Sequence, residues 1–394
     1  MPKLPLPGVP LREYVWKGPW KNARNWQRVT DPGATHPGSR EFLPNPVNEI
    51  VIDDLSGAVR CEVCIEQWSG HAGTSSKRLR LNGGPWIDVP EPDLPVDGRP
   101  ESYQYFRYPT VEIPLAVLRE GANTFELTCG PQVTHDFGWG QWGIYGMTFR
   151  VYYESSRCAL AGRVVVAGHD AQGRPILRAE ISRSSAPVAH VRFIGRYEDF
   201  PIGGENAFVD WHFRYRHGTM QGHIGDVAAA PFEIAWNPPD WLPEQAAPPQ
   251  VAAVITQRDG FAVVTGESPP PPLPGSDIAV KMYRPHDVPP CWQTRAGREH
   301  VCSVDISDDL SHAVAAKAVF VSWCGAHADA FGVNGFVLSG SVGEDHDYGY
   351  DEVDVPLEYL RPGRNRFFTR SATHHHGIEV MWPGVVLKVA YRRR

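Results

Sequence analysis

The chain has 394 residues, of which 42% are hydrophobic and 21% charged, a composition typical of a globular protein with two or three domains. Its net charge of −7 argues against a nucleic-acid-binding protein, which normally carries a basic face. No stretch is long and apolar enough for a membrane-spanning helix. The 38 glycines and 37 prolines favour many short strands joined by turns.

Residues 1–45 are rich in tryptophan and proline, and we expect an extended arm or first strand that packs on the following domain. The first residues alternate with prolines and lack the apolar core of a secretory signal peptide. We therefore expect a cytoplasmic protein unless a leader was removed.

Residues 46–156 are predicted to form the first sandwich domain. Apolar side chains at positions 59, 61, 63 and 65 alternate with polar ones, a pattern typical of a half-buried strand. Cys61 and Cys64 have C-x-x-C spacing, but on a strand their side chains would point to opposite faces. The seven scattered cysteines predict no disulfide framework.

Residues 157–267 contain four strand-like segments, at 162–166, 188–194, 231–236 and 251–255, and are predicted to form an immunoglobulin-like sandwich. Residues 268–276 are predicted to be a stiff Pro-rich linker. Residues 277–394 are predicted to form the last sandwich domain. Their alanine run, 313–318, alone would favour a helix, but the corresponding segment of the first domain alternates like a strand, so we predict a strand.

The first and last domains share several sequence anchors in the same order, which indicates an internal repeat. Asp53 precedes Trp68 by the same spacing that separates Asp308 from Trp323. The other anchors are Asn-Gly at 82–83 and 334–335, segments 112–123 and 354–365, and segments 134–138 and 373–377.

The pattern of a strand, Pro-Leu, Leu-x-x-Gly-x-Asn and a second strand occurs at residues 111–125, and its counterpart begins at residue 353. Together with the two Asn-Gly turns, it resembles galactose-binding-like jelly-roll domains and is similar to the sugar-binding domain of family 2 glycoside hydrolases. The resemblance implies an all-β fold with two jelly-roll sandwiches and an immunoglobulin-like sandwich between them. The catalytic barrel of those enzymes has no counterpart here, because nothing alternates strand and helix, so none of their catalytic residues is carried over.

Sugar sites need exposed aromatic planes beside polar groups, and each repeat supplies such residues. Trp68 lies on a strand with several charged side chains, and Trp323 stands at the equivalent position. The predicted ligand-binding residues are Trp68, His71, His135, Asp136, Trp139, Trp142, Trp323, His327, His374 and His376. The alternative is that these tryptophans pack against the opposite sheet or a neighbouring domain.

The middle domain has the densest cluster of ionisable residues. Enzymatic hydrolysis of a glycosidic bond needs two carboxyl groups at a defined separation. The candidate catalytic residues are Glu198, Asp199, Asp210, His212 and His223. Asp199 and Glu205 lie around a glycine turn, as calcium ligands do. His374 and His376 would share a strand face, as a pair of metal ligands would, or would serve as ordinary hydrogen-bonding groups. Ca²⁺ is the one cofactor that these residues suggest, and the alternative is a polar hairpin packed on a jelly roll.

Residues 345–352 form another acidic and aromatic loop. A Tyr/His pair there could move a proton in a lyase reaction, and a solvated loop is the alternative. The chain has no nucleophile elbow, phosphate loop or dinucleotide fingerprint.

The favoured hypothesis is a non-catalytic carbohydrate-recognition protein whose partner is an oligo- or polysaccharide. One alternative is a glycosidase or polysaccharide lyase that uses Glu or Asp with His or Tyr at a domain junction. The other is a structural or assembly protein whose tryptophan faces meet further subunits. The sequence predicts neither nucleic acid nor membrane as a partner and leaves homo-oligomerisation open.

Overall fold

The computed structural model describes residues 1–18, 26–132, 138–203, 207–271, 273–340, 342–374 and 377–393. In these residues nearly all regular structure is antiparallel β-sheet, which confirms the predicted all-β fold class. The helical elements are the single turn α1 (Pro37–Arg40) and 3₁₀ turns at Pro100–Ser102, Leu115–Val117, Ser155–Arg157, Leu310–His312, Gly325–His327 and Leu357–Tyr359. Across the described ranges, none of these helices is long and apolar enough to cross a membrane.

The first sandwich packs a four-stranded sheet against part of an eleven-stranded sheet. The four-stranded sheet has the order β3 (Val47–Ile52), β9 (Gly121–Thr128), β5 (Arg78–Leu81) and β6 (Ile87–Asp88). The facing strands are β1 (Leu11–Lys17), β10 (Gln141–Tyr153) and β4 (Ala58–Trp68), with β2 (Gln27–Thr30), β7 (Phe106–Arg107) and β8 (Thr110–Ile113) at their margins. Side chains such as Phe125 and Phe149 meet between the sheets in one core. β1 shows that part of the N-terminal arm is a strand, one of the two predicted forms.

The same eleven-stranded sheet continues into the middle of the chain. Its remaining strands are β20 (Ala262–Val264), β19 (Gln250–Gln257), β13 (Val188–Glu198), β14 (Val209–His212) and β17 (Gly225–Val227). A three-stranded sheet shares their core and contains β11 (Ala161–His169), β12 (Pro175–Arg183) and β18 (Glu233–Ala235). A separate hairpin, β15 (Arg214–Arg216) and β16 (Thr219–Gln221), follows β14.

The last sandwich has its own core. One sheet has the order β21 (Ile278–Tyr283), β30 (Val386–Arg392), β24 (Ala313–Trp323), β29 (Ile378–Val380) and β22 (Gln293–Thr294), with β27 (Tyr348–Asp354) also paired to β24. The facing sheet has the order β23 (Arg298–Ile306), β28 (Gly363–Ser371), β25 (Ala330–Val333) and β26 (Phe336–Ser339). The alanine run therefore lies in a strand, as predicted, and its propensity for helix is overridden by packing in the sheet.

The shared Asn motifs make matching contacts in the first and last sandwiches. Asn82 Nδ2 donates to the side-chain oxygen of Asn123 at 2.8 Å, and Asn334 Nδ2 donates to that of Asn365 at 2.8 Å. Asn123 and Asn365 are fully buried, and each also donates to the carbonyl oxygens of its own turn. The motif therefore closes a strand connection from within, which explains its recurrence in both segments.

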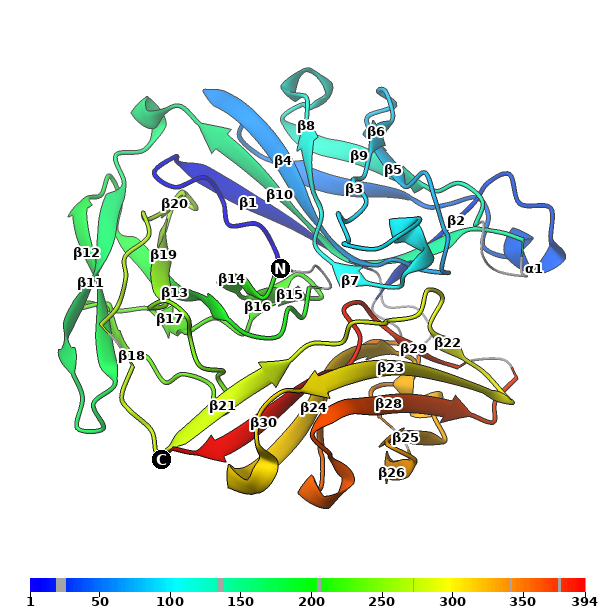
Figure 1. Cartoon of the computed structure of the whole chain (residues 1–394). Coiled ribbons are helices and arrows are strands. Elements are labelled where there is room, and N and C mark those ends of the chain that lie inside the picture. Colours follow the sequence, from blue (N-terminus) through cyan, green and yellow to red (C-terminus); the bar gives the residue numbers. More distant parts are fainter. Residues whose placement is uncertain are drawn as a thin grey trace.

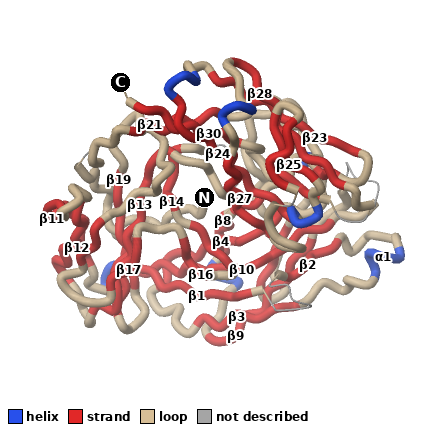
Figure 2. The backbone as a smooth tube through the Cα atoms, turned by 90° about the horizontal axis from the view of Figure 1, so that it is seen from below, coloured by secondary structure: helices blue, strands red, loops and turns tan. Residues whose placement is uncertain are grey.

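The three parts meet around one aromatic cluster. Figure 1 shows the first sandwich (blue to cyan) above the last one (yellow to red), with the green middle segment at one side of both; Figure 2 shows the same grouping from below. The cluster contains Trp68 from β4, Phe213 from the middle segment and Trp323 from β24. These contacts fix the three parts against one another and shape the pockets between them.

Candidate functional site

The tryptophans predicted to offer open planes to a sugar are buried. Trp68 and Trp323 retain 1% and 7% of their exposure, and their rings stack on each other with centroids 4.2 Å apart. Trp142 is fully buried in the core of the first sandwich. The prediction of exposed indole faces is therefore wrong for these three residues. Trp142 packs inside the first sandwich, and the polar-sided strand faces that carry Trp68 and Trp323 form the contact between the two sandwiches. The alternative, packing against a neighbouring domain, is what the structure contains.

The second predicted aromatic group is centred on Trp139, which lies beside His36 and His71. Trp139 is 8% exposed and is covered by the ring of His36, at a centroid separation of 4.8 Å. His71 lies at its edge, with Nδ1 3.4 Å from the Trp139 carbonyl oxygen. His135 and Asp136 lie outside the described residues, so their part of this prediction is untested.

The predicted catalytic residues do not gather in one place. Glu198 pairs with Arg284 at 2.7 Å, and His223 pairs with Asp226 at 3.3 Å. Only Asp199 and His212 of the five line a common pocket, whereas Asp210 lines a different one. Asp199 follows β13, and His212 ends the neighbouring strand β14 opposite Gly195. The His212 ring reaches back along β13 to the Tyr197 carbonyl oxygen, at 2.9 Å, and so lies on the same side of the pocket as Asp199.

We call the space around Asp199 and His212 the junction pocket, because the middle segment and the last sandwich both line it. Its volume is about 450 Å³, within the range of small-molecule sites. The aromatic side chains in it belong to Tyr197, Phe200, Phe213, Trp241 and Tyr350. The other lining residues are Met1, Asp199, Ile202, His212, Arg214, Gly222, Pro239, Asp240, Lys317, Glu352 and Lys388.

Two lysines face each other on the floor of this pocket. Lys317 of β24 and Lys388 of β30 are direct cross-strand neighbours, an arrangement that costs free energy for like charges. Each has a carboxylate partner: Lys317 Nζ lies 2.9 Å from a Glu352 oxygen, and Lys388 Nζ contacts Asp199. Lys317 Nζ also lies 5.3 Å from the ring centroid of Trp241. Ammonium groups, carboxylates and an indole are thus placed side by side.

The protonation states in the pocket follow from burial and these pairs. Burial alone would raise the pKa of Glu352, but the hydrogen bond and charge of Lys317 outweigh it and lower that pKa. Burial lowers the pKa of His212, whose Nε2 lies 2.9 Å from the Tyr197 carbonyl oxygen and therefore donates to it. Burial raises the pKa of Tyr350 well above its usual value. At neutral pH the pocket therefore holds an ionised Glu352, a neutral His212 and a Tyr350 hydroxyl that can donate.

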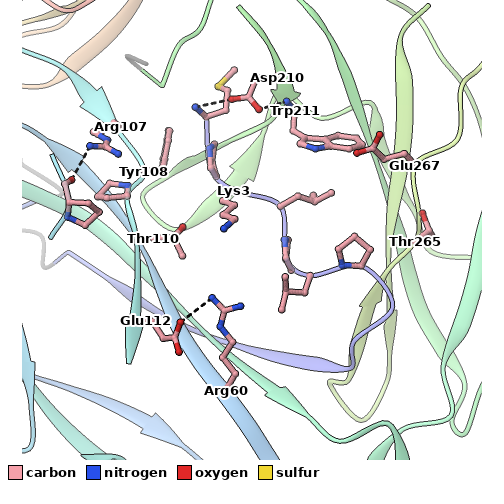
Figure 3. A pocket seen from close by; sticks show the side chains of 18 residues that line it. Lys3, Arg60, Arg107, Tyr108, Thr110, Glu112, Asp210, Trp211, Thr265 and Glu267 are labelled. Carbon is pink, nitrogen blue, oxygen red and sulfur yellow. Dashed lines mark hydrogen bonds and ion pairs between the residues drawn. The ribbon is translucent and has the colours of Figure 1, made fainter. Parts of the chain in front are cut away.

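A second pocket, of about 660 Å³, occupies the corresponding position on the first sandwich. Tyr108 and Thr110 stand at the register positions that Tyr350 and Glu352 hold in the last sandwich. This pocket is also lined by residues 1–7, and Figure 3 shows that segment, with Lys3 near the centre of the view, running along it. The chain itself thus covers part of this site, whereas the junction pocket is bordered by only one residue of that segment.

The residues proposed for Ca²⁺ do not form an oxygen cage within the described part of the chain. The ammonium group of Lys388 contacts the Asp199 carboxylate, so the position that a calcium ion would take beside this carboxylate is already held by a positive charge. Glu205 and His376 lie outside the described residues, and His374 is exposed.

Sequence reasoning missed Lys317, Lys388 and Trp241. A usable signal was present for Lys388, since a lysine between the core residues Leu387 and Val389 must lie on the opposite face of β30. No sequence pattern places Trp241, because it lies in an irregular connection.

The fold and the site define an all-β protein of packed sandwiches with a polar and aromatic pocket where they join. No known family model matches the chain, and no curated protein resembles it in sequence. Among solved structures, a beta-porphyranase of glycoside hydrolase family 86 from the human gut bacterium Bacteroides plebeius is 15% identical, covering 60% of this chain and 37% of that one, with a TM-score of 0.25. The enzyme BuGH86, in complex with neoagarooctaose, is 10% identical, covering 59% and 33%, with a TM-score of 0.25.

The aligned part amounts to about a third of the length of those enzymes. A TM-score of 0.25 supports no conclusion about the fold or the activity of this chain. We therefore transfer neither fold nor activity from them.

Proposed function

We propose that the chain is a carbohydrate-recognition protein that binds a saccharide in the junction pocket. Sugar hydroxyls donate and accept hydrogen bonds, and the C–H face of a sugar ring packs on an aromatic plane. The observation that carries the proposal is the facing pair Lys317 and Lys388, each with its own carboxylate partner, beside Trp241. Such an array presents donors and acceptors next to a flat apolar surface.

The charge balance of the pocket supports a neutral saccharide. Its cationic side chains are Lys317, Lys388 and Arg214, and its acidic side chains are Asp199, Asp240 and Glu352. The ammonium group of Met1, which also borders the pocket, is balanced by Asp210 at 3.4 Å. Burial keeps His212 neutral at pH 7. Because opposite charges are equal in number, a uronic acid or sulfated sugar gains no net attraction over a neutral one.

Binding without hydrolysis is supported by the state of the acidic groups. A glycosidase needs one carboxylic acid that stays protonated near neutral pH and a second that is ionised. Lys317 lowers the pKa of Glu352, and the Lys388 ammonium engages Asp199, so neither is suited to the acid role. A lyase base at Tyr350 is likewise disfavoured, because burial raises the pKa of its hydroxyl.

The finer architecture belongs to the same proposal. The first and last sandwiches would be galactose-binding-like jelly rolls copied from one ancestor, with an immunoglobulin-like sandwich between them. The matching hydrogen bonds of Asn82 and Asn334 support this origin. The different state of the two pockets supports specialisation of one copy for binding.

A glycan array followed by isothermal titration with the best neutral oligosaccharide tests the proposal. Trp241→Ala should weaken binding about tenfold or more, because the stacking plane is lost. Glu352→Gln should weaken it as well, because an ionised acceptor becomes a neutral amide. Trp86→Ala is the matched control: Trp86 is also half-buried and lies under a cation, with the Arg80 guanidinium carbon 4.5 Å from its ring centroid, but it does not line the junction pocket.

The proposal is wrong if no saccharide gives saturable binding, or if Trp86→Ala and Trp241→Ala lose affinity equally while both stay folded. Release of reducing sugar on incubation with a polysaccharide, abolished by Glu352→Gln, would instead establish the enzyme alternative.

A further inference from the structure

A cluster of four potential metal ligands lies in the last sandwich, away from the junction pocket. Cys324, His327, Asp345 and His346 come from two adjacent loops, one after β24 and one before β27. One ligand atom from each, a sulfur, two ring nitrogens and a carboxylate oxygen, lies within 4.8 Å of all the others. Cys324 is buried and both histidines are half-buried, whereas the Asp345 side chain is 65% exposed.

The two imidazoles converge on a single point. His327 Nε2 lies 3.0 Å from Asp345 Oδ1, and His346 Nδ1 contacts the same oxygen atom. Their ring planes are 86° apart with centroids separated by 5.6 Å, so the rings approach that point from different directions. A metal site of this kind requires several ligand atoms directed at one small volume. Here two imidazole nitrogens and a carboxylate oxygen are directed at such a volume, and a thiol lies at its buried side.

The backbone holds this arrangement in strained conformations. Cys324 and His346 both adopt left-handed angles, with φ of +56° and +52°, which costs about 1–2 kcal/mol for a residue other than glycine. The two loops are joined by a hydrogen bond from the Cys324 amide to the Asp347 carbonyl oxygen at 3.0 Å. The Trp26 indole nitrogen donates to the His346 carbonyl oxygen at 3.3 Å. Strained residues that are held by surrounding contacts concentrate at functional sites.

The corresponding turn of the first sandwich has no such cluster among the described residues. Ser69 stands there in place of Cys324, and its hydroxyl accepts the Tyr105 amide at 3.0 Å. The first sandwich therefore has no thiol at this position, and its left-handed residue there is Gly70, with φ of +88°, in place of Ser69.

We propose that Cys324, His327, Asp345 and His346 bind a divalent cation of the zinc class. Tetrahedral zinc with bonds of about 2.0–2.3 Å places its ligand atoms about 3.3–3.8 Å apart. Separations near the 4.8 Å limit of the cluster therefore have to close by about an ångström, whereas the two contacts between the histidines and Asp345 have to open as the ion takes their place. One thiolate and two imidazoles favour zinc or cobalt over magnesium or calcium, which prefer oxygen ligands. Four protein ligands define a structural site, which clips the two loops together.

Metal binding to the purified protein tests this site without reference to any saccharide. After dialysis against a chelator, the protein should bind one equivalent of Zn²⁺ by isothermal titration. Co²⁺ should give visible bands typical of tetrahedral coordination and a thiolate-to-cobalt charge-transfer band in the near ultraviolet. Added Zn²⁺ should also raise the unfolding temperature.

Single substitutions locate the ion. Cys324→Ser should abolish the charge-transfer band, and His327→Ala should weaken Zn²⁺ binding about a hundredfold. Cys291→Ser and His169→Ala are the controls, because they remove one thiol and one exposed imidazole that lie outside the cluster. Both variants should keep the charge-transfer band and the wild-type affinity for Zn²⁺. His327→Ala keeps the test valid if loss of the buried thiol prevents folding, since the His327 side chain is 27% exposed.

The site is refuted if the folded wild-type protein gives no saturable heat with Zn²⁺ and no charge-transfer band with Co²⁺. It is also refuted if folded His327→Ala retains wild-type affinity, or if Cys291→Ser removes the band.

Discussion

Replacing Glu379 by glutamine should stabilise the protein at alkaline pH and change its stability little at pH 5. Glu379 lies on β29, is buried, and accepts a hydrogen bond from Gln293 Nε2 at 2.7 Å. Burial raises the pKa of its carboxyl from 4.5 to about 8, against the opposing effects of the Arg295 charge and of the nearby polar groups of Gln104, Trp68 and Gln293. Because Gln104 and Trp68 belong to the first sandwich, this carboxyl is buried where the two sandwiches meet.

The magnitude follows from proton linkage. The folded protein keeps the proton up to about pH 8, whereas the unfolded chain releases it near pH 4.5. Stability therefore falls as pH rises between these values, by about 1.4 kcal/mol per pH unit. Over about 3.5 pH units, the difference between 4.5 and about 8, the loss is about 5 kcal/mol. Glutamine has nearly the same shape and carries no proton to lose, so the variant escapes this loss.

Urea unfolding followed by tryptophan fluorescence measures the effect in wild type and Glu379→Gln at several pH values from 5 to 9. The free-energy difference between the two proteins should grow steadily from pH 5 and level off above pH 8. Glu299→Gln, which alters an exposed carboxylate in the same sandwich, should give a difference that does not change over this range. A constant difference for Glu379→Gln would refute the argument that burial keeps this carboxyl protonated.

Three further sets of substitutions test the packing. Trp68→Ala and Trp323→Ala should each cost about 3–5 kcal/mol in urea unfolding, and the double variant should cost less than their sum because the rings stack on each other; additive costs would contradict a direct contact. Asn82→Ala and Asn334→Ala should cost similar amounts, about 1–3 kcal/mol, and strongly unequal losses would contradict their equivalence. Lys388→Met should cost about 3–5 kcal/mol by removing the counter-ion of a largely buried carboxylate, and an unchanged urea midpoint would contradict this.

Much of the fold could be predicted because the patterns that specify it are local. Alternation along residues 59–65 identified a strand, which is part of β4, but the prediction that it is half-buried was wrong, because residues 61–68 are buried on both faces. The Asn motif recurs because Asn123 and Asn365 close strand connections with contacts only a few residues away. The strand over the alanine run was predicted from its counterpart alone, since residue propensity favoured the wrong structure.

The candidate site could not be predicted to the same extent because it depends on contacts between distant segments. Alternation assigns Trp68 to a polar-sided strand face, but it does not reveal that Trp323 covers that face. Asp199 and His212 were identified as polar residues of interest, and their grouping with Lys317 arises only when the last sandwich packs on the middle segment. The convergence of Cys324 on the loop before β27 likewise depends on the conformation of two separate turns.

The junction pocket exists because the two sandwiches, alike in their cores, differ on their outer faces. In the first sandwich Glu62 faces Arg150 across the strands, and the two side chains form an ion pair at 3.4 Å. At the same register positions of the last sandwich, Lys317 faces Lys388. Two facing ammonium groups repel each other unless anions come from elsewhere, and the middle segment supplies one in Asp199. The last sandwich could therefore not form this pocket without the middle segment, so a saccharide bound there would contact both parts of the chain and strengthen their association.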